Sequence, residues 1–153
     1  MMEKHVKDTN CPSCCRLEAR VAILELLQRY CRTVDDRDAV AFEALWAPGA
    51  QVDFGPRYRG AASGLLDWIT GNHAKTRSMS HHLSGSLIAL TEDLCSAASS
   101  CDVSALLLEE RGGHTQTRWI RGRYHDQLIV HNNEWRFAYR RFEARQSVAA
   151  PAI

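Results

Sequence analysis

The sequence predicts an α+β domain in which helices close one end of a strongly curved β-sheet. Apolar residues recur at helical spacing only in the first half of the chain. The second half consists of long alternating segments separated by short turn sequences. Helices followed by a meander of strands are typical of α+β folds, whose helices pack on one face of the sheet. At 153 residues the chain has the size of a single domain.

The first helix is predicted over residues 15–33. Its apolar residues recur at steps of three and four, which places them on one side of a helix. These residues are Leu17, Val21, Ile23, Leu24, Leu27 and Tyr30. The polar residues 1–13 that precede it are expected to form a disordered or loosely docked leader.

Two shorter helices and a strand are predicted next. Asp38 is a good N-cap for a helix over residues 39–46, which a Pro-Gly pair would end. Alternation predicts a strand over residues 51–54. A further helix is predicted over residues 61–70, with Leu65, Leu66, Trp68 and Ile69 packed inward.

The rest of the chain is predicted to form long strands, over residues 79–90, 97–108, 114–130 and 135–144. Thr-Glu-Asp and Glu-Arg-Gly-Gly turns separate the first three, and the His-Asn-Asn-Glu sequence before the last is a tight hairpin signal. The domain would span residues 14–146, with a C-terminal tail over 147–153. A curved sheet closed by helices at one end forms a cone with a pocket inside.

Composition excludes several classes of protein. A net charge of +1 argues against a dedicated nucleic-acid binder. Arginines crowd the C-terminal third, where their alternate spacing fits the solvated face of strands. They are Arg118, Arg121, Arg123, Arg136, Arg140, Arg141 and Arg145. No apolar run approaches the ~20 residues of a membrane span, and no secretory signal is visible, so a cytoplasmic protein is expected.

The six cysteines predict neither disulfides nor a metal site. Their spacing is irregular, and thiols stay reduced in the cytoplasm. Cys11 and Cys14 lie near His5, but a structural zinc site needs four ligands, and no second pair with metal-binding spacing follows. No phosphate-binding loop or dinucleotide motif is present either. The expected protein therefore uses no metal and no cofactor.

Tyr30 and Asp35 are the first candidates for chemistry. They are five residues apart, about 140° around a continuous helix, so they would face one cavity only if the helix tightens or ends early. A carboxylate at a helix C-terminus is unfavourable against the helix dipole. Asp36 can be solvated and Asp38 can cap the next helix, which leaves Asp35 for a functional role.

His81 and His82 open a predicted strand and supply the imidazole. Adjacent strand residues point to opposite faces, so only one of them can enter a pocket. Alternation leaves the choice open, because His81 would share a face with Leu83 and Leu87, whereas His82 would share one with Ile88 and two serines. Tyrosine, carboxylate and imidazole together can move a proton on and off a carbon skeleton.

Two segments resemble the SnoaL-like branch of the nuclear transport factor 2-like superfamily. They are QRYCRTVDDRDAVAFEALWAPGAQVDFG and RGRYHDQLIVHNNEWRFAYRRFEAR, and the resemblance extends from about Leu17 to Arg145. In this branch a helix ends in a tyrosine, a short step and an aspartate. The sequence HLSGS is similar to the strand that carries the catalytic histidine in scytalone dehydratase and lindane dehydrochlorinase. The resemblance therefore assigns that role to His82 and places Asp35 on their aspartate. Bile acid 7α-dehydratase is similar too, with a tyrosine at the place of Tyr30.

The resemblance implies a cofactor-independent lyase, most simply a dehydratase acting on a small hydrophobic polycyclic, aromatic or steroid-like substrate. His82 would remove a proton, Asp35 would orient its ring, and Tyr30 would act as the acid. An isomerase or a polyketide cyclase could use the same residues. A non-catalytic binding module, like the small subunit of aromatic-ring dioxygenases, would share the fold and do no chemistry.

Further side chains are expected to line the pocket: Trp46, Phe54, Trp68, Tyr124, His81 and His131. The aromatic residues among them fit a plain core equally well. His131 stands near the place of an arginine in lindane dehydrochlorinase. Apolar residues also fall on strand positions that the helices would leave uncovered, namely Leu128, Val130, Phe137 and Tyr139. They predict a homodimer or homotrimer formed through that face.

Overall fold

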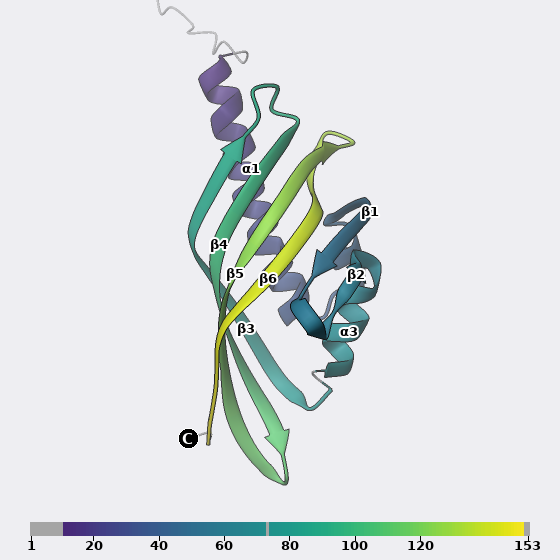
Figure 1. Cartoon of the computed structure of the whole chain (residues 1–153), viewed down its shortest axis with the longest axis vertical. Helices are drawn as coiled ribbons and strands as arrows, with labels where there is room; N and C mark the ends of the chain where they lie inside the picture. Colours follow the sequence, from purple (N-terminus) through teal and green to yellow (C-terminus); the bar gives the residue numbers. More distant parts are fainter. Residues whose placement is uncertain (1–10, 73, 152–153) are drawn as a thin grey trace, which may run out of the picture.

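The computed structural model describes residues 11–72 and 74–151, which form three α-helices and one six-stranded sheet (Figure 1). The helices are α1 (Pro12–Asp35), α2 (Ala39–Glu43) and α3 (Leu65–Asn72), with short 3-10 turns η1 (Gly55–Arg57) and η2 (Ala62–Gly64). The strands are β1 (Trp46–Asp53), β2 (Arg59–Ala61), β3 (Thr76–Leu90), β4 (Ser96–Arg111), β5 (His114–His131) and β6 (Glu134–Pro151). The predicted α+β class is confirmed.

The sheet is mixed, curved and not closed into a barrel. Its strand order is β2-β1-β6-β5-β4-β3, in which β1 runs parallel to β6 and every other pair is antiparallel. Figure 1 shows the sheet bending along its length, with α1 across one face and α3 beside the start of β3. The hollow side of the bend, with the helices that cover it, frames the space for a site.

Helix α1 packs against β3 and β6 along one side. Its buried apolar residues, Ala19, Ile23, Leu26, Leu27, Tyr30, Cys31 and Val34, belong to the main core. The helix begins at Pro12, where a proline is well tolerated in the first turn. Of the leader expected over 1–13, residues 1–10 lie outside the described part of the chain. Leu17, Val21 and Leu24, expected to face inward, are at least 42% exposed.

Helix α1 ends in a Schellman motif that ties it to β3. Arg37 adopts a left-handed backbone with φ of 55°. Its N–H donates to the Val34 carbonyl at 3.2 Å, and the Asp38 N–H donates to the Thr33 carbonyl at 2.9 Å. The Arg37 side chain then donates to the carbonyl of Thr76, the first residue of β3, at 2.8 Å. The end of the helix is thereby held beside the strand that carries both histidines.

The predicted N-cap of α2 is confirmed, but the helix is shorter than expected. The Ala41 N–H donates to Asp38 Oδ1 at 3.0 Å. The helix ends at Glu43, and Pro48 and Gly49 lie inside β1 instead of ending α2. The register between β1 and β6 shifts between Trp46 and Gln51, which makes room for them. Proline is accommodated in a sheet at such irregularities.

The long strands of the C-terminal half extend further than their alternation predicted. Strand β6 runs to Pro151, so residues 147–151 of the expected tail continue the sheet, and Thr117 of β5 lies opposite Ala150. Pairing with the equally long β5 satisfies the backbone groups of these exposed residues. None of the helices in the described residues is both long and apolar enough to cross a membrane.

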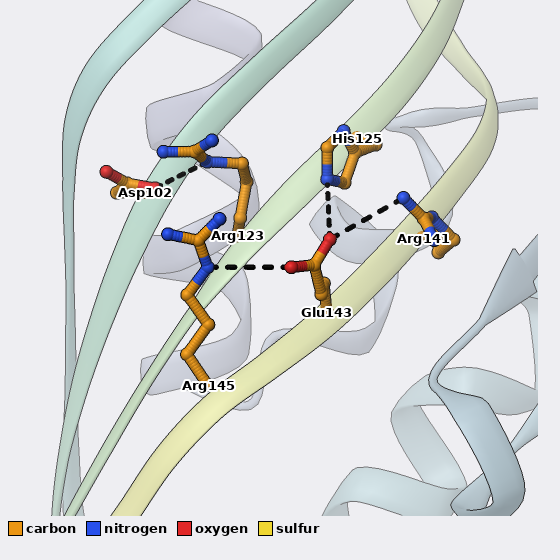
Figure 2. Close-up of polar contacts among 6 residues, drawn as sticks. All are labelled: Asp102, Arg123, His125, Arg141, Glu143 and Arg145. Carbon is orange, nitrogen blue, oxygen red and sulfur yellow. Dashed lines mark hydrogen bonds and ion pairs between the residues drawn. The ribbon is translucent and has the colours of Figure 1, made fainter.

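The face of the sheet turned away from α1 carries charged residues, and we call it the open face (Figure 2). Arg123 Nε donates to Asp102 Oδ1 at 2.6 Å. Around Glu143, the closest atoms of His125, Arg141 and Arg145 lie 3.2, 3.7 and 3.5 Å from its carboxylate oxygens.

Of the four apolar residues expected on an uncovered face, Val130 is exposed, Tyr139 is half-buried, and the other two are placed differently. Leu128 and Phe137 have no exposed surface and belong to the core that α1 covers. The reason is register, because they lie opposite each other on the helix side of the β5–β6 hairpin.

Candidate active site

A cavity of about 770 Å³ opens between the hollow side of the sheet and the covering elements. Strands β3 to β6 line it together with α1, η1 and α3. Its walls are mainly apolar and aromatic, and they include Val34, Phe54, Trp68, Ile69, Val103, Ala105, Leu107, Ile120, Tyr124 and Phe142. A volume of this size is typical of small-molecule sites.

His81 and Asp35 form a close pair at the wall of this cavity. His81 Nδ1 lies 2.5 Å from Asp35 Oδ1, and the His81 backbone N–H donates to Asp35 Oδ2 at 2.9 Å. Both side chains are largely buried, with 13% of His81 and 20% of Asp35 exposed. One carboxylate thus holds the backbone and the ring of the same residue. A neutral ring that donates Nδ1–H to Asp35 has Nε2 free to accept a proton.

The histidine expected to pair with Asp35 was His82, and the structure places His81 there instead. His82 lies on the other face of β3, where its Nε2 is 2.9 Å from Ser80 Oγ, and its side chain is exposed. His81 lies opposite Ala105, which lines the cavity, whereas His82 lies opposite Ser104. Since adjacent strand residues point to opposite faces, His82 cannot enter the cavity.

A bulge in β3 explains why alternation did not settle this choice. The register with β4 shifts between Ser84 and Leu87, around Gly85 with φ of 59°. Beyond the bulge the faces exchange, so Leu87 is 72% exposed. The residues before the bulge do indicate the correct histidine, because Met79 and Leu83 share a face with His81 and both pack against the core.

Tyr30 lines the same cavity from α1. Its ring is 1% exposed and packs at 5.6 Å from the ring of Tyr124. Burial, opposed in part by the positive charge of Arg140, raises the pKa of Tyr30 to about 12. The hydroxyl is therefore protonated at neutral pH and can donate a hydrogen bond. Burial also raises the pKa of Tyr124 well above its ordinary value.

Tyr30 and Asp35 approach the cavity without any tightening of α1. The helix is continuous through Asp35, so the two side chains leave it in different directions. Tyr30 touches the cavity directly, whereas Asp35 does not line it and reaches it through His81. The early helix end considered from the sequence is not needed.

A buried ion pair behind Tyr30 was missed by sequence reasoning, which placed Arg140 on a solvated face. Arg140 Nε and Nη2 lie 2.7 and 2.9 Å from the two oxygens of Asp126, and neither side chain is exposed. The guanidinium lies 4.1 Å from the ring centroids of Tyr30 and Tyr124. Burial alone would lower the pKa of Arg140, but attraction to Asp126 outweighs it and raises this pKa. The sequence contained one clue to this burial. Asp126 is two residues from Tyr124, so both side chains lie on the same face of β5, and Arg140 lies opposite Asp126 on β6.

The other expected pocket residues divide into two groups. Phe54, Trp68 and Tyr124 line the cavity, as expected. Trp46 does not, because it packs among Tyr30, Phe42 and Phe137 in the core. His131 lies at the β5–β6 hairpin, opposite Glu134, at the end of the sheet away from α3 (Figure 1). Sequence reasoning also missed three arginines of the cavity wall, Arg57, Arg111 and Arg118.

Metal-binding side chains do not gather at this site. Within residues 11–72 and 74–151, no three His, Cys, Asp or Glu side chains lie close enough to hold a metal ion. The chemistry of the wall is instead that of an acid–base pair, a protonated phenol and an apolar enclosure.

A family model described as a SnoaL-like domain matches residues 15–141. The chain belongs to the SnoaL-like domain family. No curated protein matches this SnoaL-like chain. The fold is the one found in nuclear transport factor 2-like proteins.

Three solved structures illustrate the likeness. A scytalone dehydratase-like protein from Novosphingobium aromaticivorans is 20% identical, with a TM-score of 0.78 over 89% of this chain and 90% of its own. Hexachlorocyclohexane dehydrochlorinase LinA-type3 from Novosphingobium barchaimii is 17% identical, with a TM-score of 0.80 over 92% and 96%. A nuclear transport factor 2-like protein from Salmonella enterica serovar Typhimurium is 17% identical, with a TM-score of 0.72 over 86% and 94%. At such identities the likeness shows a shared fold.

Proposed function

We propose that this SnoaL-like protein is a cofactor-independent lyase, a dehydratase that acts on a small hydrophobic polycyclic, aromatic or steroid-like compound. The observation that carries the proposal is the pair of His81 and Asp35 at the wall of an apolar cavity that Tyr30 also lines. Two structural relatives named above, a dehydratase-like protein and a dehydrochlorinase, carry the names of elimination enzymes.

In the proposed reaction His81 Nε2 removes a proton from a carbon made acidic by a neighbouring carbonyl. Asp35 holds the ring through Nδ1 and stabilises the imidazolium that forms, as the acid does in a hydrolase triad. The electron pair of the broken C–H bond forms a carbon–carbon double bond, and the C–O bond to the departing hydroxyl breaks. The proton on His81 then leaves with that hydroxyl as water, which restores the neutral ring.

Tyr30 serves this reaction best as a hydrogen-bond donor. Because burial raises its pKa to about 12, full transfer of its proton would leave a costly buried phenolate. A hydrogen bond to the carbonyl or to the departing oxygen stabilises the charge that develops there at no such cost. The apolar walls strengthen this interaction by excluding water.

Product analysis in deuterated water tests the proposal. The protein is incubated with a panel of cyclic β-hydroxy ketones, and the products are identified by mass spectrometry and NMR. Loss of water to give a conjugated alkene is expected. Deuterium exchange or double-bond migration without loss of water would instead assign an isomerase. Ring closure would assign a cyclase, and binding of the ketones with no turnover of any kind would leave a binding module.

A further inference from the structure

Three arginines make one part of the cavity wall basic. Arg57 comes from η1, Arg111 from the last residue of β4, and Arg118 from β5. Among the described residues that line the cavity, none is an aspartate or a glutamate. Arg57 and Arg111 are exposed, with 59% of the Arg111 side chain in solvent, whereas 20% of the Arg118 side chain is exposed. Three cations along one part of a concave wall, with no carboxylate among its described lining residues, create a positive potential, which favours an anionic ligand over a neutral hydrocarbon.

One internal carboxylate accounts for only part of this charge. Glu109 is 4% exposed, and its Oε2 lies 2.9 Å from Arg118 Nη2 and 3.3 Å from Arg111 Nε. Two guanidinium groups thus share one carboxylate. Arg57 has no ion pair within residues 11–72 and 74–151. The basic part of the wall therefore carries an excess of positive charge.

The sheet register places this basic part away from His81 along the same inner face. His81 lies opposite Ala105, and Ala105 lies opposite Ile120 on β5. Arg118 is two residues further along β5 on the same side. Strands lie about 4.8 Å apart and rise about 3.3 Å per residue, which puts the backbones of His81 and Arg118 roughly 12 Å apart. A span of this order matches the length of a fused-ring skeleton.

We infer that the ligand of this cavity carries an oxyanionic group, such as a carboxylate, which binds at Arg57, Arg111 and Arg118 while its ring skeleton extends toward His81. This inference adds a substrate class to the proposed function, and it rests on that function only where the bound ligand is taken to be the substrate. Guanidinium groups bind carboxylates through paired, charge-assisted hydrogen bonds, and these are strongest where least water competes, at Arg118 with 20% of its side chain exposed. The acidic group would then set the distance and direction at which the reacting carbon meets His81.

A matched pair of fluorescent probes tests the inference without any turnover. The probes are 8-anilinonaphthalene-1-sulfonate and N-phenyl-1-naphthylamine, which share one ring system and differ by the sulfonate. Their dissociation constants are measured by fluorescence titration of the full chain. The sulfonate probe is expected to bind about tenfold or more tightly than the neutral one, a difference typical of charge-assisted hydrogen bonds.

The variants assign that preference to the cavity. The double variant Arg57→Gln with Arg111→Gln removes two guanidinium groups and leaves buried Glu109 paired with Arg118. Its affinity for the sulfonate probe should fall about tenfold, with the neutral probe unchanged. The control is Arg121→Gln, an exposed arginine opposite Ser104 of the open face, which should change neither constant. Equal loss for both probes, or an unchanged affinity for the sulfonate probe in the double variant, would overturn the inference.

A second measurement separates this inference from the proposed function. In His81→Ala the preference for the sulfonate probe should persist, because the arginines remain in place. If the protein prefers the sulfonate probe but eliminates water from no ketone, the anion site is supported and the lyase activity is contradicted. If the protein eliminates water from neutral ketones but shows no preference for the sulfonate probe, the lyase activity is supported and the anion site is contradicted.

Discussion

At the scale of single residues, the site depends on how Asp35 holds His81. The carboxylate binds the ring at 2.5 Å and the backbone N–H at 2.9 Å. Both bonds fix the same strand residue, so the imidazole has little freedom to rotate. His82 makes only a local contact with Ser80 on the opposite face. The two histidines therefore form a natural pair of test and control.

His81→Ala is expected to lower turnover about a hundredfold or more, the usual scale for loss of a general base. His82→Ala should stay within about twofold of the wild type, because its ring lies outside the cavity. Initial rates of alkene formation measure both, and circular dichroism checks the fold. Equal losses in the two variants would contradict the assignment of the base to His81.

Buried acidic groups also predict how stability depends on pH. Burial raises the pKa of Tyr30 from 10.0 to about 12 and that of Cys31 from 9.0 to about 12, and it raises Cys101 from 9.0 to about 11. These groups keep their protons to a higher pH in the folded state than in the unfolded state. Their contribution to the free energy of unfolding is complete below pH 9 and is lost as the pH rises toward 12.

The free energy of unfolding should therefore fall between about pH 9 and pH 12. For Tyr30 alone, two pKa units correspond to about 3 kcal/mol. Tyr30→Phe removes the titrating hydroxyl and keeps the ring, so its alkaline decline should be shallower than that of the wild type. Urea titrations at a series of pH values measure this. Parallel declines in the two proteins would show that Tyr30 does not contribute.

At the scale of elements, the bulge in β3 keeps apolar side chains on the correct face. Ser84 pairs with Asp102, and Leu87 pairs with Ser100, so one extra residue lies on β3 between these pairs. Gly85 at this point has a left-handed φ of 59°, a backbone that residues with a side chain rarely adopt. The bulge thus lets Leu83 and Ile88 both pack on the core.

Gly85→Ala is expected to destabilise the protein by about 1 kcal/mol, the cost of a left-handed backbone for a residue with a Cβ. Crowding adds little, because the nearest atom to the new Cβ would be Asp102 Oδ2 at 3.8 Å. Gly71→Ala in α3 is the control, since its Cβ meets nothing within 4 Å and alanine favours helices. Urea denaturation compares them. The idea fails if the Gly85 variant proves as stable as the Gly71 variant.

At the scale of the whole molecule, the open face carries a row of exposed apolar side chains in addition to its charged residues. Leu106, Trp119 and Val148 lie opposite one another on β4, β5 and β6 and are 47%, 51% and 48% exposed. The ion pairs of Figure 2 lie along the same strands. This row takes the place of Leu128 and Phe137, which were expected on an uncovered face. Three large exposed apolar side chains at neighbouring positions favour association with a second copy.

We therefore predict a homodimer or homotrimer that forms through the open face. Trp119→Glu should convert it to a monomer, because the charge would have to be buried in the interface. Val40→Glu on α2 is the control, since Val40 is 82% exposed and lies on another element. Light scattering after size-exclusion chromatography measures the masses. A monomeric wild type would contradict the prediction.

Local pattern alone was sufficient for much of the fold and part of the site. The helical repeat placed Tyr30 on the first helix and Asp35 just beyond its predicted end, and Asp38 as an N-cap depends only on its own neighbours. Long alternating segments indicated the strands, and Phe54 and Trp68 were correctly expected at the cavity. These features follow from the periods of helix and strand, which any short stretch of sequence displays.

Only the tertiary structure decided which histidine meets Asp35, which arginine is buried and how far β6 extends. Each answer depends on a partner distant in sequence: Ala105 opposite His81, Asp126 opposite Arg140, and β5 along the end of β6. A bulge of one residue exchanges the two faces of a strand, and its position follows from packing across the sheet. Composition and spacing could therefore identify the reactive side chains, while long-range register chose among them.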